Sequence, residues 1–96
     1  MLKVIAVNVV KEECAEQYLA IAKELVEKTN KFDKGCIKYE LCKDIGDPLR
    51  FVMLEEWEDK GSLDAHFNAP HFVELIPKLG DCTQGPAEIT LLEKAF

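Results

Sequence analysis

A nearly unbroken apolar run near the start of the chain limits the possible folds more than any other feature. From Val4 to Val10 the only polar residue is Asn8, and the apolar side chains fall at both odd and even positions. Because successive side chains of a β-strand point to opposite faces, residues 2–10 are predicted to form a strand buried on both faces. The fold must therefore supply an apolar cover on each side of its sheet.

The periodicity changes after this first strand. From about Glu12 to Thr29, apolar residues recur every three or four positions, which predicts an amphipathic helix. The sequence Asp33-Lys34-Gly35 is expected to end it. Residues 36–43 then alternate, with Ile37, Tyr39 and Leu41 on one predicted face, and indicate a strand with one buried side.

The second half of the chain repeats this order. Residues 50–58 read as a strand that forms a hairpin with residues 36–43. Asp59 can cap a short helix that runs to about Asn68, and Pro70 can open a further short helix. Residues 87–94 are predicted to close the chain as a last strand.

The predicted order βαββαβ indicates an α+β, ferredoxin-like fold with a four-stranded antiparallel sheet, formed by one domain over residues 1–96. The helices of such a fold cover only one face of the sheet. Since several strands are apolar on both faces, we expect a homodimer in which two sheets face each other.

Charge and composition exclude several classes of partner and site. The formal net charge is −6 and no cluster of basic residues interrupts it, so nucleic acid and anionic membranes are poor partners. No apolar run reaches the length of a membrane span, and the first strand lacks the marks of a signal peptide. We therefore expect a cytoplasmic protein whose four cysteines stay reduced. Neither the cysteines nor the two histidines show the spacing of a zinc site, so no metal is expected.

Two stretches of the sequence carry a family resemblance. The first, Gly35–Leu41, reads GCIKYEL, and the second joins RFVMLEEW at 50–57 to LDAHFNAPHF at 63–72. Both resemble the antibiotic biosynthesis monooxygenase family, and the likeness covers essentially the whole chain. The resemblance implies a dimeric α+β barrel and the oxidation of a quinol or polyphenol by molecular oxygen, with no cofactor. Met53 stands where polyketide-oxidising members have an asparagine, and Ile76 falls near the histidine of haem-degrading members, which disfavours haem degradation.

Three residues are candidates for catalysis. Asn8 is a polar break in an apolar strand, where burying an amide needs a compensating partner, such as a substrate oxygen or nearby backbone. His66 shares a predicted helix face with apolar residues, and a neutral imidazole could accept a phenolic proton. Glu55 has the parity of apolar neighbours, where desolvation would raise its pKa and suit it to proton transfer. An ion pair is the structural alternative for Glu55, and a core position is the alternative for His66.

Five residues are candidates for binding an aromatic substrate. Trp57 and Phe67 could stack on a flat ring, and the Tyr39 hydroxyl could bind an oxyanion. Met53 shares the parity of Trp57. His71 lies one residue away from the apolar stripe of its helix and is expected to lie at the rim of the site or to cap a helix.

Two other functions fit the same residues. A histidine and a glutamate in a cleft could enolise a small carbonyl compound, which would make the protein an isomerase. A dimer that only sequesters an aromatic metabolite, such as a stress-response protein, would also need an apolar cleft with a few polar groups.

Overall fold

The computed structural model describes all 96 residues and has the predicted ferredoxin-like α+β architecture. One antiparallel sheet carries the strands in the order β2-β3-β1-β4. The strands are β1 (Leu2–Val9), β2 (Cys36–Lys43), β3 (Arg50–Trp57) and β4 (Glu88–Glu93). The helices are a 3-10 turn η1 (Glu12–Cys14), α1 (Ala15–Phe32), α2 (Lys60–Phe67) and α3 (Pro70–Gly80). None of the helices combines the length and the apolar composition that a membrane span requires.

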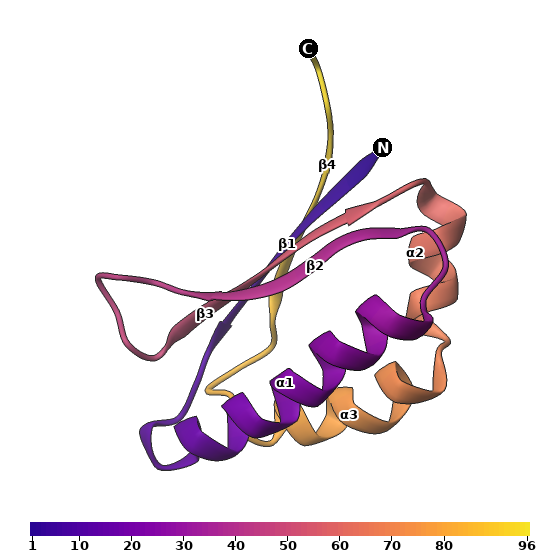
Figure 1. Cartoon of the computed structure of the whole chain (residues 1–96). Helices are drawn as coiled ribbons and strands as arrows, with labels where there is room; N and C mark the ends of the chain where they lie inside the picture. The colour runs from indigo at the N-terminus through magenta and orange to yellow at the C-terminus, as the bar shows by residue number, and fades with distance from the viewer.

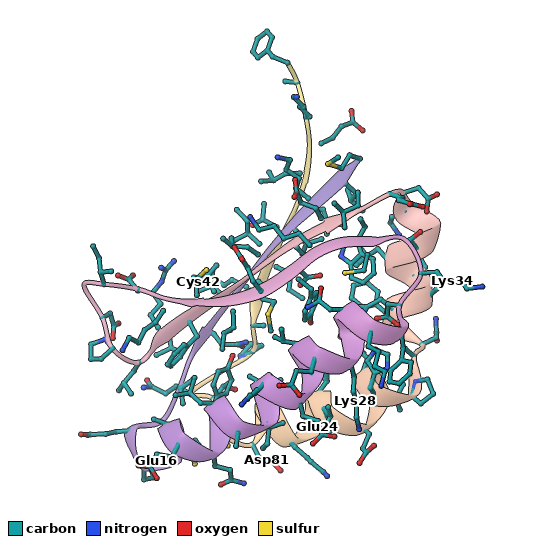
Figure 2. All side chains as sticks on the ribbon, viewed as in Figure 1. Glu16, Glu24, Lys28, Lys34, Cys42 and Asp81 are labelled. Carbon is teal, nitrogen blue, oxygen red and sulfur yellow. The ribbon has the colours of Figure 1, made fainter.

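All the helices lie on one side of the sheet, with α1 and α3 packed against each other (Figure 1). Figure 2 shows Glu24 and Lys28 on α1, and these charged side chains form an ion pair 2.6 Å long on the exposed surface of that helix. The opposite side of α1 buries apolar residues such as Leu25 against the sheet. This division is the one that the helical period predicts.

Strand β3 forms the floor of the core. Its residues alternate between half-buried and buried, and the buried series is Phe51, Met53, Glu55 and Trp57. The register places β1 and β2 on either side of it, so that Val4 and Tyr39 both lie opposite Glu55. A carboxylate thus occupies the centre of an otherwise apolar row.

The loops follow the predicted chemistry. Gly35 has φ +79°, the left-handed region that glycine adopts without strain, and it turns the chain from α1 into β2. Asp59 caps α2 by accepting a hydrogen bond of 2.7 Å from the Ser62 amide. Pro70 occupies the first turn of α3, as expected.

The prediction for the face of Ile37 is wrong. The register between β2 and β3 shifts between Cys36 and Lys38, which places Cys36 opposite the buried Trp57 and leaves Ile37 48% exposed. A β-bulge adds one residue to a strand and so reverses the alternation on one side of it. The other expected members of that face, Tyr39 and Leu41, are buried and half-buried.

The second face of the sheet has no helix over it. It carries Ile5 and Val7 from β1, Val52 and Leu54 from β3, and Leu92 from β4, all accessible to solvent in the single chain. Strand β4 is exposed along its entire length and extends with the C-terminus beyond the helices (Figure 1). All four cysteines are free thiols, with Cys82 buried and the other three half-buried.

Candidate functional site

A cavity of about 140 Å³ lies between the inner face of the sheet and the helices. Most of its lining is apolar, and Asn8 and Glu55 are the two polar residues among it. Of the predicted site residues, the cavity brings five together: Asn8, Tyr39, Met53, Glu55 and Phe67. Three other predicted residues, Trp57, His66 and His71, do not line it.

Glu55 is the chemically most distinctive group of the cavity. Its residue is 7% exposed, and its one hydrogen-bond donor is the indole Nε1 of Trp57, 3.0 Å from Oε1. Burial raises the pKa of Glu55 to about 7, while the hydrogen bond from Trp57 opposes that rise. Near neutral pH this carboxyl is therefore divided between its acid and base forms.

Asn8 is positioned by a contact between the sheet and α1. Its side-chain Nδ2 donates a hydrogen bond of 3.1 Å to the hydroxyl of Tyr18, which is buried. This partner is a side chain and not the nearby backbone, which was the structural alternative expected from the sequence. Burial also raises the pKa of the Tyr18 hydroxyl, so that it stays protonated.

The remaining predicted residues of the cavity are aromatic or apolar. Tyr39 lies across the strand pair from Glu55, and its buried hydroxyl has a pKa well above its usual range because of desolvation and the neighbouring acid. Phe67 is 38% exposed and its ring centroid lies 5.3 Å from that of Phe72, which also lines the cavity. Met53 contributes an apolar side chain from the buried row of β3.

His66 points inward, as predicted, and is 1% exposed. Its ring centroid lies 4.7 Å from both Trp57 and Phe72 and 5.1 Å from Tyr39, so aromatic side chains surround it. Its Nδ1 lies 2.6 Å from Oδ2 of Asp33, and its Nε2 is buried without a partner. Desolvation lowers the pKa of His66, and the bond to Asp33 acts in the opposite direction.

The prediction that His71 lies at a rim is wrong. His71 is only 7% exposed, and its Nε2 lies 3.0 Å from the same Oδ2 of Asp33. Its position beside the apolar stripe of α3 directs it toward the end of α1. The partner there is separated from it by 38 residues and could not be read from the periodicity of the helix.

Asp33 was expected only as part of the helix stop. The structure places it directly after α1, with its carboxylate between the two histidines. No sequence signal marks this role, because the chain has 18 acidic residues and the contact depends on how α2 and α3 dock at the end of α1.

The cavity can hold a small ring and take a proton from it. Its volume is close to the roughly 150 Å³ of an apolar cavity that accommodates benzene. A carboxylate with a pKa near the ambient pH can accept a proton and later release it. Because Glu55 is the only acid in the lining, it is the candidate for that step.

A family model described as "Antibiotic biosynthesis monooxygenase" matches residues 1–78. Among curated proteins, an uncharacterized protein of Synechocystis is 32% identical over 93 residues, which are 96% of this chain and 63% of that protein. The chain therefore spans less than two thirds of that relative. YcnE of Bacillus subtilis, which is named a candidate monooxygenase, is 30% identical over 88% of this chain and 87% of its own length.

Solved structures give the same relationship. A conserved protein from Methanosarcina mazei superimposes with a TM-score of 0.94 at 39% identity, over 97% of this chain and 91% of its own. A structure described as an antibiotic biosynthesis monooxygenase superimposes with a TM-score of 0.93 at 37% identity, over 99% of both chains.

Proposed function

Because this chain belongs to the antibiotic biosynthesis monooxygenase family, we propose that it is a cofactor-independent monooxygenase that oxidises a quinol-type small aromatic with molecular oxygen. The observation that carries the proposal is Glu55, a buried carboxylate with a pKa of about 7 in the lining of an apolar cavity. An electron-rich aromatic needs only the loss of a hydroxyl proton to become a strong reductant. The cavity offers one group that can remove it.

The proposed reaction begins with proton transfer from a substrate hydroxyl to Glu55. The resulting anion gives electrons to O₂, one oxygen atom enters the ring, and the other leaves as water with two hydrogen atoms. A hydroquinone and O₂ thus give a hydroxyquinone and water, and no external reductant is required. In the water-poor cavity, Asn8 and Tyr39 hold the substrate oxygen by hydrogen bonds.

The sequence predicts His66 as the base. This proposal assigns that role to Glu55, because Glu55 lines the cavity and His66 does not. The ring of His66 instead packs against the rings of Tyr39 and Trp57. Trp57 is a positioning residue, since its indole holds Oε1 of Glu55. Phe67 and Met53 form the apolar walls against which the substrate ring packs.

The volume of the cavity favours a substrate with one ring. A benzene-sized cavity accepts a substituted hydroquinone more readily than a fused polycyclic phenol, which would have to displace Phe67 or Phe72. Oxygen consumption with one-ring, two-ring and three-ring quinols, each corrected for autoxidation, measures this preference. We expect the rate to fall with each added ring.

Replacing Glu55 with glutamine (Glu55→Gln) tests its role as the base. We expect protein-dependent oxygen uptake to fall at least about 100-fold, the usual contribution of a general base, since glutamine fills the same space without accepting the proton. The wild-type rate should rise with pH through about 7 as Glu55 ionises. The matched control is Glu58→Gln, which removes an exposed carboxylate just after β3 and should keep full activity.

Two outcomes would redirect the proposal. Exchange of solvent deuterium into a carbonyl substrate without oxygen uptake would assign Glu55 to an isomerase. Saturable binding of an aromatic compound with no chemical change in air would indicate a binding protein. Unchanged uptake in Glu55→Gln would remove Glu55 from the mechanism.

The uncovered face of the sheet supports a further part of the proposal, a homodimer. Ile5, Val52, Leu54 and Leu92 form an apolar surface on this face, and Lys3 and Glu56 form an ion pair of 3.3 Å among them. A second copy of the sheet would cover this surface. The two cavities would then lie on the outer sides of the paired sheets, one in each subunit.

A further inference from the structure

Three potential metal ligands from three different helical segments meet beside the sheet, outside the lining of the cavity. Asp33 follows the last residue of α1, His66 lies in α2, and His71 lies in the first turn of α3. One ligand atom from each lies within 4.8 Å of the others. Both histidines are buried and Asp33 is half-buried.

The separation of Asp33 from each histidine is close to the separation of two ligands around a single metal ion. Asp33 Oδ2 lies 2.6 Å from His66 Nδ1 and 3.0 Å from His71 Nε2. Ligands about 2.0–2.1 Å from one ion lie roughly 3.0 Å apart at a right angle and about 3.3 Å apart in a tetrahedron. All three ligand atoms lie within 4.8 Å of one another, so adjustment of the side chains would bring them to the spacing that a single ion requires.

The cluster is also accessible from solvent. A hollow of about 400 Å³ lies beside it and is lined by Asp33, His71 and Glu74. Glu74 lies one helical turn after His71 and offers a further carboxylate to the same space. Lys28 also lines the hollow, but its ammonium is held by Glu24 at 2.6 Å. An ion could thus enter from the hollow and keep water in its remaining positions.

We propose that Asp33, His66 and His71 form a binding site for a divalent transition-metal ion of the zinc, cobalt or nickel class. Two imidazole nitrogens and one carboxylate oxygen suit these ions, whereas magnesium and calcium prefer oxygen ligands alone. A bound ion would tie the end of α1 to α2 and α3. Because it binds the folded state selectively, it would stabilise the protein. The site lies outside the cavity of the proposed oxidation, since none of its residues lines that cavity, and it touches the cavity only through the contacts of His66 with Tyr39 and Trp57.

Ion binding should change the tautomer of His66. A carboxylate can only accept a hydrogen bond, so Nδ1 of His66 carries the proton that is donated to Asp33. An ion on Nδ1 would move that proton to Nε2, which has no partner in the structure. Nitrogen-15 NMR of the two imidazole rings distinguishes these tautomers and does not depend on catalysis.

The decisive experiment titrates the whole protein with Zn²⁺ by calorimetry and with Co²⁺ by absorption. We expect one ion per chain, a higher melting temperature, and at least tenfold weaker binding in both Asp33→Asn and His71→Gln. The matched control is Glu16→Gln, an exposed acid in the first turn of α1, which should bind as the wild type does. Circular dichroism verifies that each variant folds. If one of the two variants does not fold, the other one carries the test.

Several results would overturn the site. Equal affinity in the wild type and Asp33→Asn would show that the ion binds elsewhere. A sulfur-to-cobalt charge-transfer band would assign the ion to one of the free thiols. Unchanged imidazole resonances at saturating Zn²⁺ would exclude both histidines as ligands.

Discussion

Two carboxylates inside this fold differ in how their charge is satisfied. Asp33 accepts from two imidazoles, whereas Glu55 accepts from a single indole and otherwise faces apolar side chains. With so little compensation, desolvation dominates at Glu55 and its pKa rises. Ionised Glu55 therefore lowers the free energy of unfolding. A residue with a purely structural role would not be expected to do so.

The stability of the protein should therefore depend on pH through Glu55. Its pKa is about 7 in the folded state against 4.5 in the unfolded chain, so the folded protein binds more protons between these values. The free energy of unfolding should fall as pH rises through this range, by roughly 3 kcal/mol relative to Glu55→Gln. Urea denaturation of both proteins between pH 4.5 and 8.5 measures the difference. A difference that stays constant with pH would contradict the prediction.

The turn between α1 and β2 packs against the start of α2. Gly35 turns the chain with a positive φ, and a Cβ atom at this position would collide with the Ser62 side chain. Ser62 in turn donates its amide and its hydroxyl to Asp59, the cap of α2. The turn before β2 and the start of α2 are therefore packed as one unit.

Gly35→Ala should destabilise the protein by about 2–3 kcal/mol, because it adds both backbone strain and the collision with Ser62. Gly80→Ala is the matched control, since no atom lies within 4 Å of a Cβ there and Gly80 is the last residue of α3. The control should change stability by no more than about 0.5 kcal/mol, because alanine favours a helix. Thermal unfolding of both variants tests the pair, and equal losses would show that Ser62 yields without cost.

Periodicity predicts the elements of this chain better than it predicts its contacts. The strand at Cys36–Lys43 has the predicted bounds, and the parity of β3 places Glu55 among buried apolar residues as expected. Ile37 is wrong because a bulge shifts the register without a mark in the alternation. His71 is wrong because its partner, Asp33, comes from a distant segment. Contacts between distant segments depend on how the helices dock, which no local pattern records.

At the scale of the whole molecule, the sheet is covered on one face only. The helices pack on the face that contains the cavity, and the other face exposes apolar residues from three strands. Strand β4 adds Leu92 to this surface and extends beyond the helices. The single chain therefore forms the whole four-stranded sheet but leaves apolar side chains on one face of it exposed.

Sedimentation equilibrium at micromolar concentration should return twice the mass of one chain. Leu54→Glu, which places a charge in the uncovered face, should shift the equilibrium to monomers at least tenfold. Leu19→Glu is the matched control, because Leu19 is exposed on α1 on the other side of the molecule. A wild-type monomer would contradict the proposed dimer, and dissociation by both variants would indicate a non-specific effect of charge.

The bond between Trp57 and Glu55 gives this protein an optical probe of its own cavity. Trp57 is the only tryptophan of the chain, it is fully buried, and its indole N–H is bonded to the carboxyl whose pKa is about 7. The emission of this one fluorophore should therefore follow the protonation of Glu55, with a midpoint near pH 7 that disappears in Glu55→Gln. A compound that enters the cavity and exchanges a proton with Glu55 would change the same signal. Candidate substrates can thus be ranked by fluorescence before any turnover is measured.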